Sequence, residues 1–493
     1  MNRRSFLQTS LATAAALQAA AQDNKALFGL GQRYEGAPAG HEAPEPNPPA
    51  RPNVIWIFGD QLRAQALSFN GDPNARTPSL ERAEVNGMNF EHNLSGFPLC
   101  CPFRGSLLTS RYPNHCVPGH EYPLPKGQQT IADVFNANGY NTGYIGKWHL
   151  GGWHESNGRA AFFITDPDRR GGFQHWVGYE NNNSQWDCWV HGGRGKDAFH
   201  YRLPGYETDA LTNLFIQYLN EQATSQKNGQ GKPFFAVLSV EPPHDPNVAP
   251  EQYMVHFQPE RLKLRPNTAQ VARVEERARR ELAGYYAQIE NLDWNYGRIV
   301  GALEDNKQLF NTHILFFADH GEMGGSHGMF RKVNPHEEAI RTPMIFSGGL
   351  PAYGGLKRGR VPVLSNHVDI APTTLGLCGI KKPDWMKGND LSHFRLAKAS
   401  PGVDPDSAYL QNVIPTGHPD SINTPYRGLV TKDGWKYVCF ENQSWLMFNL
   451  NEDPYEEANL AQNNMYRMER KKLIDRLAQW VHDTSDHFTL PPD

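Results

Sequence analysis

Three largely apolar runs mark strands of a buried sheet. Val54–Asp60, Phe234–Val240 and Thr312–Asp319 show no alternation of apolar and polar positions, which is typical of strands covered on both faces, as in parallel sheets. The first and third runs end in a carboxylate, and Glu241 and His244 follow the second. Ligands of open α/β sheets bind beyond the carboxyl ends of the strands, so we expect one site built from these distant segments.

Between the strands, apolar residues recur at helical spacing. Six apolar or aromatic residues before the strand at 312–319 are spaced three, four or seven positions apart, which predicts one buried face of a long helix. They are Leu282, Tyr286, Ile289, Tyr296, Ile299 and Leu303. Segments 128–138 and 209–220 are further helix candidates. This alternation predicts an α/β fold with a large, doubly wound, mostly parallel sheet flanked by helices.

The pattern changes from about residue 395. Short β-like runs between Tyr426 and Leu450 are separated by turn residues, and a helical segment covers 463–484. We therefore expect a catalytic domain at residues 51–394 and a C-terminal α+β subdomain at 395–493, built from a small antiparallel sheet and a helix.

The amino terminus has the features of an export signal. Arg3 and Arg4 form a twin-arginine pattern, an Ala-rich stretch follows, and Ala19–Ala21 offers a small-residue cleavage site. We expect residues 1–21 to be a twin-arginine-type signal peptide and residues 22–50 a Pro-rich linker. The mature protein is then predicted to be periplasmic or secreted.

Composition narrows the function classes. The 493 residues carry 48 Lys and Arg against 52 Asp and Glu, so there is no basic excess to indicate binding to nucleic acid. No apolar run reaches the roughly 18 residues of a membrane span. The 6 cysteines are too few for a disulfide scaffold and form no CxxC pair, which excludes zinc-ribbon and thioredoxin-like sites.

The most informative segment starts at adjacent cysteines. Cys100-Cys101-Pro102-Phe103-Arg104 resembles the type I sulfatase signature C-x-P-S-R, which precedes a helix carrying Leu-Thr-Gly. Cys100, Pro102 and Arg104 keep the minimal pattern. Phe103 stands where the family usually has Ser, and Ser110 stands where it has Gly.

Further motifs resemble the family in the same order along the chain. They are Pro52–Gln61, Thr77–Leu80, Gly143–Gly151, Asp319–Glu322 with Ser326–Gly328, Glu337–Pro343, Asp369–Thr373 and Asp453–Glu457. On these motifs the chain is identified as a member of the formylglycine-dependent sulfatase family, in the alkaline phosphatase superfamily. The resemblance covers residues 51–461 and implies the fold of that superfamily.

The resemblance implies a modified nucleophile. Cys100 would be oxidised to formylglycine by a dedicated formylglycine-generating enzyme. One hydroxyl of the hydrated aldehyde would attack the sulfur of a sulfate ester, and the other, once deprotonated, would expel sulfate. Arg104 would brace the hydrate, and His149 would hydrogen-bond it and act as its base.

The resemblance also implies groups that hold and protonate the ester. Lys147 and Lys332 would hold sulfate oxygens as fixed positive charges, although Arg331 is an alternative to its neighbour Lys332. His244 would donate a proton to the leaving oxygen or hold the ester.

One divalent metal ion is implied as well, with Asp60, Gln61, Asp319 and His320 as its ligands. The oxygen-rich set favours Ca²⁺. The histidine makes Mn²⁺ an alternative.

A sulfated carbohydrate is the expected substrate. The stretch 153–200 follows the Lys147 motif and is rich in Trp, His, Arg and Asn. Aromatic faces stack on sugar rings, while Arg and Asn contact hydroxyls and sulfates. Trp176 and Asn182 in this stretch, and His418 in the C-terminal subdomain, are candidate contacts with a polysaccharide or glycosaminoglycan fragment. The alternative is a long loop that packs on itself.

Two other functions stay open on the sequence. A phosphonate or phosphate ester hydrolase of the same superfamily could carry the same metal ligands. A catalytically silent protein that binds sulfated glycans would result if Cys100 stayed a thiol.

Overall fold

The computed structural model of the protein describes residues 51–349 and 355–492. The predicted signal peptide and linker, residues 1–21 and 22–50, lie outside the described residues. Within the described ranges, no helix combines the length and apolarity needed to cross a membrane.

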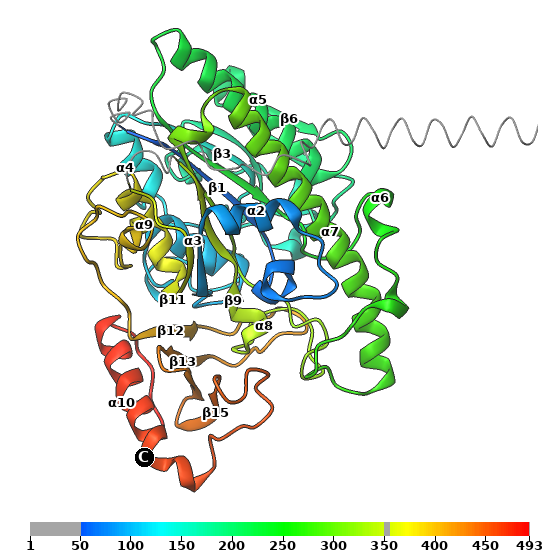
Figure 1. Ribbon diagram of the computed structural model, residues 1–493, viewed down its shortest axis with the longest axis vertical. Coiled ribbons are helices and arrows are strands. Elements are labelled where there is room, and N and C mark those ends of the chain that lie inside the picture. The colour runs from blue at the N-terminus through cyan, green and yellow to red at the C-terminus, as the bar shows by residue number, and fades with distance from the viewer. Residues whose placement is uncertain (1–50, 350–354, 493) are drawn as a thin grey trace, which may run out of the picture. The chain divides into compact units, whose positions relative to one another are not determined.

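A large mixed sheet forms the centre of the fold (Figure 1). In spatial order its strands are β11 (Gly359–Asn366), β2 (Met88–Leu94), β10 (Met344–Gly348), β8 (Thr312–Ala318), β1 (Asn53–Gly59), β7 (Phe234–Val240), β3 (Asn141–Lys147), β4 (His175–Tyr179), β5 (Trp189–Gly192) and β6 (Phe199–Arg202), with β9 (Arg341–Thr342) paired to β2.

The middle of this sheet is parallel, as the apolar runs predict. Strand β1 lies between β8 and β7 in parallel register, with Gly59 opposite both Ala318 and Val240. On the other side of β7, Gly146 of β3 pairs with Ser239, also in parallel. The residues that follow β8, β1, β7 and β3 therefore emerge at one edge of the sheet.

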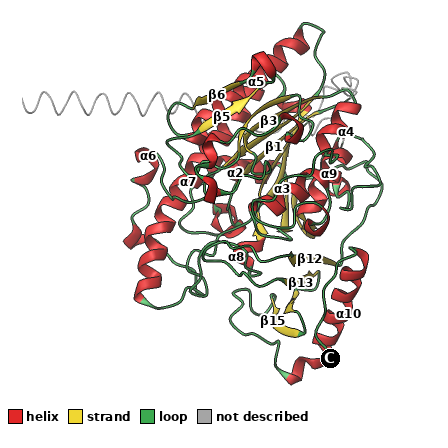
Figure 2. Cartoon of the chain, turned by 180° about the vertical axis from the view of Figure 1, so that it is seen from behind, coloured by secondary structure: helices red, strands yellow, loops and turns green. Residues whose placement is uncertain are grey.

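Helices cover both faces of the sheet (Figures 1 and 2). On one side α7 (Ala272–Asp305), α5 (Glu207–Lys227) and α2 (Pro78–Asn86) pack against Ile55 and Ile57 of β1. On the other side, Val54, Trp56 and Phe58 of β1 meet a second group of helices, which are α3 (Cys100–Thr109), α4 (Ile131–Ala137) and α9 (Ile370–Leu377). The doubly wound architecture and the three helices predicted around this sheet are confirmed. The short helices are α6 (Glu251–Met254) and α8 (Glu337–Ile340).

A separate antiparallel sheet follows, as predicted. Its strands are β12 (Ser407–Asn412), β13 (Tyr426–Thr431), β14 (Trp435–Phe440) and β15 (Gln443–Asn449), in that order. Helix α10 (Arg467–Asp483) packs on one face through Leu473 and Leu477, while Leu410 and Val438 pack with Ile340 on the other. The predicted runs cover β13 to β15 but not β12. The domain boundary at residue 395 stays a prediction.

Candidate active site

Helix α3 places two residues of the signature on one face. The helix begins at Cys100, after Leu99 in an extended conformation. Cys100 and Arg104 lie four residues apart, so both side chains project toward the same neighbours. Those neighbours are the ends of the central strands.

The two departures from the family signature have structural partners. Phe103 is buried in the core, with its ring centroid 5.4 Å from that of His367. Ser110 ends α3 at φ 50°, a left-handed conformation that favours glycine. Its hydroxyl donates to the Val368 carbonyl at 2.7 Å and accepts from the Gly388 N–H at 2.9 Å. These bonds offset the conformational cost of a side chain at this position.

The Cys100 thiol lies in a charged and closed environment. The residue is 1% exposed, and its Sγ lies 3.1 Å from Lys332 Nζ, 3.3 Å from His320 Nε2 and 3.5 Å from Asp60 Oδ1. Burial and the Asp60 carboxylate raise the pKa of this thiol to about 12. An unmodified Cys100 is therefore protonated at neutral pH and is a poor nucleophile.

Arg104 joins the ends of four strands. One terminal nitrogen donates to the Lys147 carbonyl at 2.7 Å and to Ser239 Oγ at 2.8 Å. The other lies 3.2 Å from Asp60 Oδ2 and 3.3 Å from Asp319 Oδ2. These four partners belong to β3, β7 and the residues after β1 and β8, so the buried guanidinium fixes the carboxylates relative to the helix.

Lys147 is a buried cation between two carboxylates. Its Nζ lies 2.9 Å from Asp60 Oδ2 and 3.0 Å from Glu241 Oε1. Burial would lower the pKa of Lys147, but these carboxylates outweigh burial and raise the pKa well above its usual value. Glu241 also accepts backbone N–H groups of Asn182 and Asn183, each at 3.2 Å. Asn182 is thereby tied to the site through its backbone.

Lys332 and His244 form a second pair. Lys332 Nζ lies 2.8 Å from His244 Nε2, while His244 Nδ1 donates to the Asp245 carbonyl at 2.7 Å. Burial and Lys332 lower the pKa of His244, so the imidazole is neutral and its Nε2 accepts a hydrogen bond from the ammonium group. The alternative cation, Arg331, instead forms an ion pair with Glu281 at 2.9 Å.

Two carboxylates and an imidazole converge at the ends of β1 and β8. Donor atoms of Asp60, Asp319 and His320 lie within 4.8 Å of one another and of the Cys100 sulfur. His320 Nδ1 donates to the Gly321 carbonyl at 3.0 Å, which leaves Nε2 as the free ligand atom. Burial and the Asp60 charge raise the pKa of Asp319 to about 7, because two buried carboxylates repel each other and Arg104 only partly offsets this.

Gln61 completes the set of four predicted ligands. Its Nε2 donates to Glu322 Oε2 at 2.5 Å, while its Oε1 is buried and has no hydrogen-bond partner among the described residues. A buried acceptor without a partner is the group that a bound cation would satisfy. The donor set therefore fits a hard divalent metal ion.

Comparison with known proteins identifies the family. A model described as Sulfatase matches residues 52–380, and one described as N-sulphoglucosamine sulphohydrolase, C-terminal, matches residues 325–483. The chain belongs to the sulfatase family. It is a sulfuric ester hydrolase with the alkaline phosphatase-like fold.

Relatives of this sulfatase match along most of its length. An ulvan-active sulfatase from Formosa agariphila is 33% identical over 460 residues, covering 89% of this chain and 83% of that one. An endo-4-O-sulfatase from Bacteroides thetaiotaomicron is 28% identical over 481 residues, covering 86% and 90%. The solved structure of a candidate sulfatase from Bacteroides fragilis has a TM-score of 0.78 at 28% identity, covering 91% and 98%.

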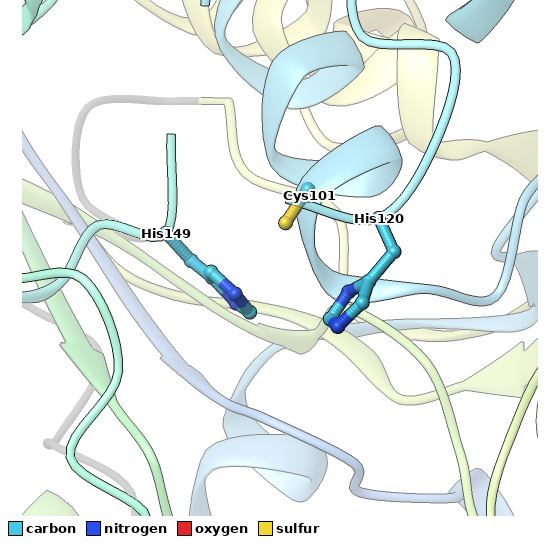
Figure 3. Close-up of side chains that lie close together, drawn as sticks. All are labelled: Cys101, His120 and His149. Atoms are coloured by element: carbon cyan, nitrogen blue, oxygen red, sulfur yellow. The ribbon is translucent and has the colours of Figure 1, made fainter. Parts of the chain in front are cut away.

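Three histidines line one side of the sulfatase site. His149, at φ 53° and 4% exposed, has its pKa lowered well below the usual value by burial and by Lys147. Its ring centroid lies 5.7 Å from that of His120 (Figure 3), which in turn lies 5.5 Å from that of His418. The predicted contact His418 thus belongs to this wall, and burial and Lys332 lower its pKa to about 2.

Trp176, another predicted substrate contact, lies in the core of the sulfatase. It is 5% exposed, its ring centroid is 6.0 Å from that of Trp148, and the Arg170 guanidinium lies 4.6 Å from its ring. The structure does not bring Trp176 together with the residues around Cys100. Part of the stretch 153–200 forms β4, β5 and the start of β6, which extend the edge of the sheet, and the rest is loops and short turns.

Some residues of this site were not predicted. Glu241 was noted after the run at 234–240 but given no role, because the ligand roles of Asp60 and Asp319 came from the family resemblance. Glu322, which orients Gln61, lies inside a recognised motif. His120 lies in a loop where neither spacing nor periodicity marks it.

Proposed function

We propose that this sulfatase hydrolyses sulfate esters of a carbohydrate through a formylglycine at position 100 and one divalent metal ion. The observation that carries the proposal is the environment of Cys100, where Lys332, His320 and Asp60 converge within 3.5 Å of the sulfur. A site with this charge density is suited to an anionic ester. A protonated thiol could not exploit it as a nucleophile.

The modified residue would supply the nucleophile. A formylglycine hydrate offers one hydroxyl to attack sulfur and a second whose deprotonation releases sulfate. His149 is neutral, and its buried Nδ1 has no hydrogen-bond partner within the described ranges. It is therefore able to accept the proton of that second hydroxyl. Arg104 holds the surrounding carboxylates in place.

Two lysines would neutralise the transferring group. Lys147 and Lys332 are charged and buried, so they need little rearrangement to bind sulfate oxygens. The Lys332 ammonium group also donates a hydrogen bond to His244 Nε2. This pair holds a transferable proton beside position 100, where it would neutralise the leaving alcohol.

The metal ion would be held by Asp60, Gln61, Asp319 and His320. When bound, it would polarise a sulfate oxygen and lower the pKa of the hydrate. The three oxygen-donating residues favour Ca²⁺, and the imidazole leaves Mn²⁺ as the alternative.

The substrate in this proposal is a sulfated polysaccharide or glycosaminoglycan fragment. Two relatives support it by name, one active on ulvan and one an endo-4-O-sulfatase. Asn182 and His418 are the proposed sugar contacts, since the first adjoins Glu241 and the second adjoins His120. The twin-arginine pattern at the amino terminus supports an exported protein that meets a formylglycine-generating enzyme during maturation.

Mass spectrometry of the tryptic peptide ending at Arg104 tests the nucleophile. Protein co-produced with a formylglycine-generating enzyme should carry an aldehyde in place of the Cys100 thiol and should release sulfate from sulfated glycans. A thiol in protein from the native source would favour a silent glycan-binding protein. Faster turnover of phosphonate than of sulfate esters would favour the phosphonate hydrolase.

Removal of the metal ion tests the second part of the proposal. Treatment with a strong chelator should abolish turnover, and addition of Ca²⁺ or Mn²⁺ should restore it and show which ion serves. Full activity after exhaustive chelation would contradict a metal-dependent reaction.

A further inference from the structure

A second group of ligand atoms adjoins the nucleophile. Cys101 on α3, His120 in the following loop and His149 after β3 bring one sulfur and two imidazoles within 4.8 Å of one another. Figure 3 shows the three side chains pointing toward a common space from separate segments. None of the three is a predicted ligand of the oxygen-rich centre at Asp60 and Asp319.

Both imidazoles in this group have an unused nitrogen. The Nδ1 atoms of His120 and His149 are buried, and neither finds a hydrogen-bond partner in residues 51–349 or 355–492. His149 is 4% exposed, so water does not readily satisfy its nitrogen. Buried polar atoms without partners are uncommon in folded proteins. Here two of them lie beside a thiol.

Glu121 supports the group from outside. Its backbone N–H donates to Cys101 Sγ at 3.3 Å, and its Oε1 lies 3.9 Å from His120 Nε2. The Glu121 carboxylate is held by the Glu155 N–H at 2.8 Å, so that its charge faces the far nitrogen of His120 and leaves the near nitrogen for a metal, and carboxylates near a ligating histidine are typical of metal sites. The other carboxylate oxygen of Glu121 lies 2.8 Å from His154 Nδ1.

The two imidazoles are in the protonation state that binds metal ions, whereas the thiol must lose its proton on binding. Burial lowers the pKa of His120 to about 4 and that of His149 well below its usual value, so both rings are neutral, the form that binds metal ions. Burial raises the pKa of Cys101. Binding would therefore replace the thiol proton by a sulfur–metal bond and release that proton to solvent, so that affinity rises with pH.

We propose that Cys101, His120 and His149 form a binding site for one Zn²⁺ ion and that zinc bound there inhibits the sulfatase. One sulfur and two nitrogen ligands with a fourth, open position match the preferences of Zn²⁺ and differ from the oxygen-rich set that favours Ca²⁺. The side chain of His120 is 20% exposed and gives the ion a route from solvent.

Inhibition follows because His149 is both the proposed catalytic base and a proposed zinc ligand. Zinc ligation would occupy the nitrogen that the proposed reaction needs as a base, and it would add positive charge one residue from the nucleophile. This part rests on the proposed function. Zinc binding itself does not.

Equilibrium dialysis with ZnCl2, on the mature enzyme saturated with Ca²⁺, tests binding. The wild type should bind one Zn²⁺ per chain, and Cys101→Ala and His120→Ala should each weaken binding at least about 10-fold, as loss of even an outer partner does. Glu121→Gln, which removes no ligand, should weaken binding to a smaller extent. Cys378→Ala removes another buried free cysteine and should bind zinc like the wild type.

Sulfate release measured over the same ZnCl2 series tests inhibition. Cys101→Ala should keep basal turnover and need at least about 10-fold more zinc for half-inhibition, in step with its binding. Equal zinc binding by the wild type, Cys101→Ala and Glu121→Gln would overturn the site. Zinc that binds through Cys101 without slowing turnover would overturn the inhibition. An enzyme without sulfatase activity would refute the proposed function, while dialysis would still decide on the site.

Discussion

Two buried lysines of this protein have the same immediate chemistry and different surroundings. Lys147 and Lys436 are both fully buried, and each lies between two carboxylates. The Nζ–O distances are 2.9 Å to Asp60 and 3.0 Å to Glu241 for the first, and 2.8 Å to Glu337 and 2.6 Å to Glu456 for the second.

The surroundings separate a reaction centre from a structural link. Beside Lys147 lie Gln61 Oε1 and His149 Nδ1, which are buried and find neither a hydrogen bond nor an ion pair among the described residues, whereas the buried Glu337 Oε1 beside Lys436 is held in an ion pair at 2.8 Å. Lys436 connects β14 to α8, and its carboxylate partners also bond each other, through the Glu337 N–H to the other Glu456 oxygen at 2.7 Å. A buried ion pair by itself therefore says little about function, whereas buried polar atoms without a partner beside it indicate a binding site for a ligand.

Removal of the proposed nucleophile beside Lys147 should cause the largest loss of activity. Cys100→Ala should lower sulfate release roughly 10⁴-fold or more, the scale of nucleophile deletions, because no other buried group would form the hydrate. Circular dichroism and the Tm should stay close to the wild type, as in Cys378→Ala. Turnover within 10-fold of the wild type would place the nucleophile elsewhere.

Lys147→Met should separate the two lysines by activity. Loss of a fixed charge on the transferring group should lower kcat/KM by about 10²–10³-fold. The measurement is initial rates on a sulfated glycan, corrected for the folded fraction. A loss of less than about 3-fold would remove Lys147 from sulfate binding.

Lys436→Met is the matched change at the other lysine. It leaves Glu337 and Glu456 buried without their cation, which should lower the free energy of unfolding by about 3–5 kcal/mol. Urea unfolding measures this loss, and kcat/KM of the folded fraction should not change. A selective loss of kcat/KM in the folded fraction would mean that the link also serves the reaction.

Glu456→Gln should have the smallest effect, visible only as a pH dependence. Burial and Glu337 raise the pKa of Glu456 from 4.5 to about 8, although Lys436 opposes them. The folded protein then keeps a proton that the unfolded chain releases, so this contribution to stability is complete below about pH 4.5 and is lost as the pH rises toward 8. Because one pKa unit corresponds to about 1.4 kcal/mol, the loss over this range should be a few kcal/mol at most.

Urea unfolding at pH 5 and pH 8 checks this expectation. The wild type should lose stability between the two values, and the Gln variant, which imitates the protonated carboxyl, should lose less. Identical slopes in the two proteins would assign the dependence to another group.

The parts of the site that the sequence predicted well lie at the ends of buried parallel strands. Asp60 and Asp319 could be placed because buried parallel strands read as continuous apolar runs, and the residues after such strands share one edge. The same rule places Glu241 at that edge, but the roles of Asp60 and Asp319 came from the family resemblance. The first strand of the antiparallel sheet was harder to predict, since β12 with the sequence SAYLQN has neither a continuous apolar run nor a strict alternation.

The rest of the site depends on long-range contacts that local patterns do not encode. Trp176 attracted attention through composition, but β4 has only five residues, and its inward and outward faces could not be told apart without the register. His120 joins His149 and His418 only because a loop folds back over α3. Lys332 was placed by family resemblance, and its contact with His244 needed the structure.

The burial of Cys100 has a consequence for the order in which the chain is modified and folds. A side chain that is 1% exposed, beneath the ends of β1, β8 and the Lys332 loop, is out of reach of a second protein. An enzyme that converts this cysteine must therefore act during the interval between synthesis and folding. The yield of active sulfatase would then depend on the rate of Cys100 conversion relative to the rate of folding. A variant that folds faster would be converted less completely.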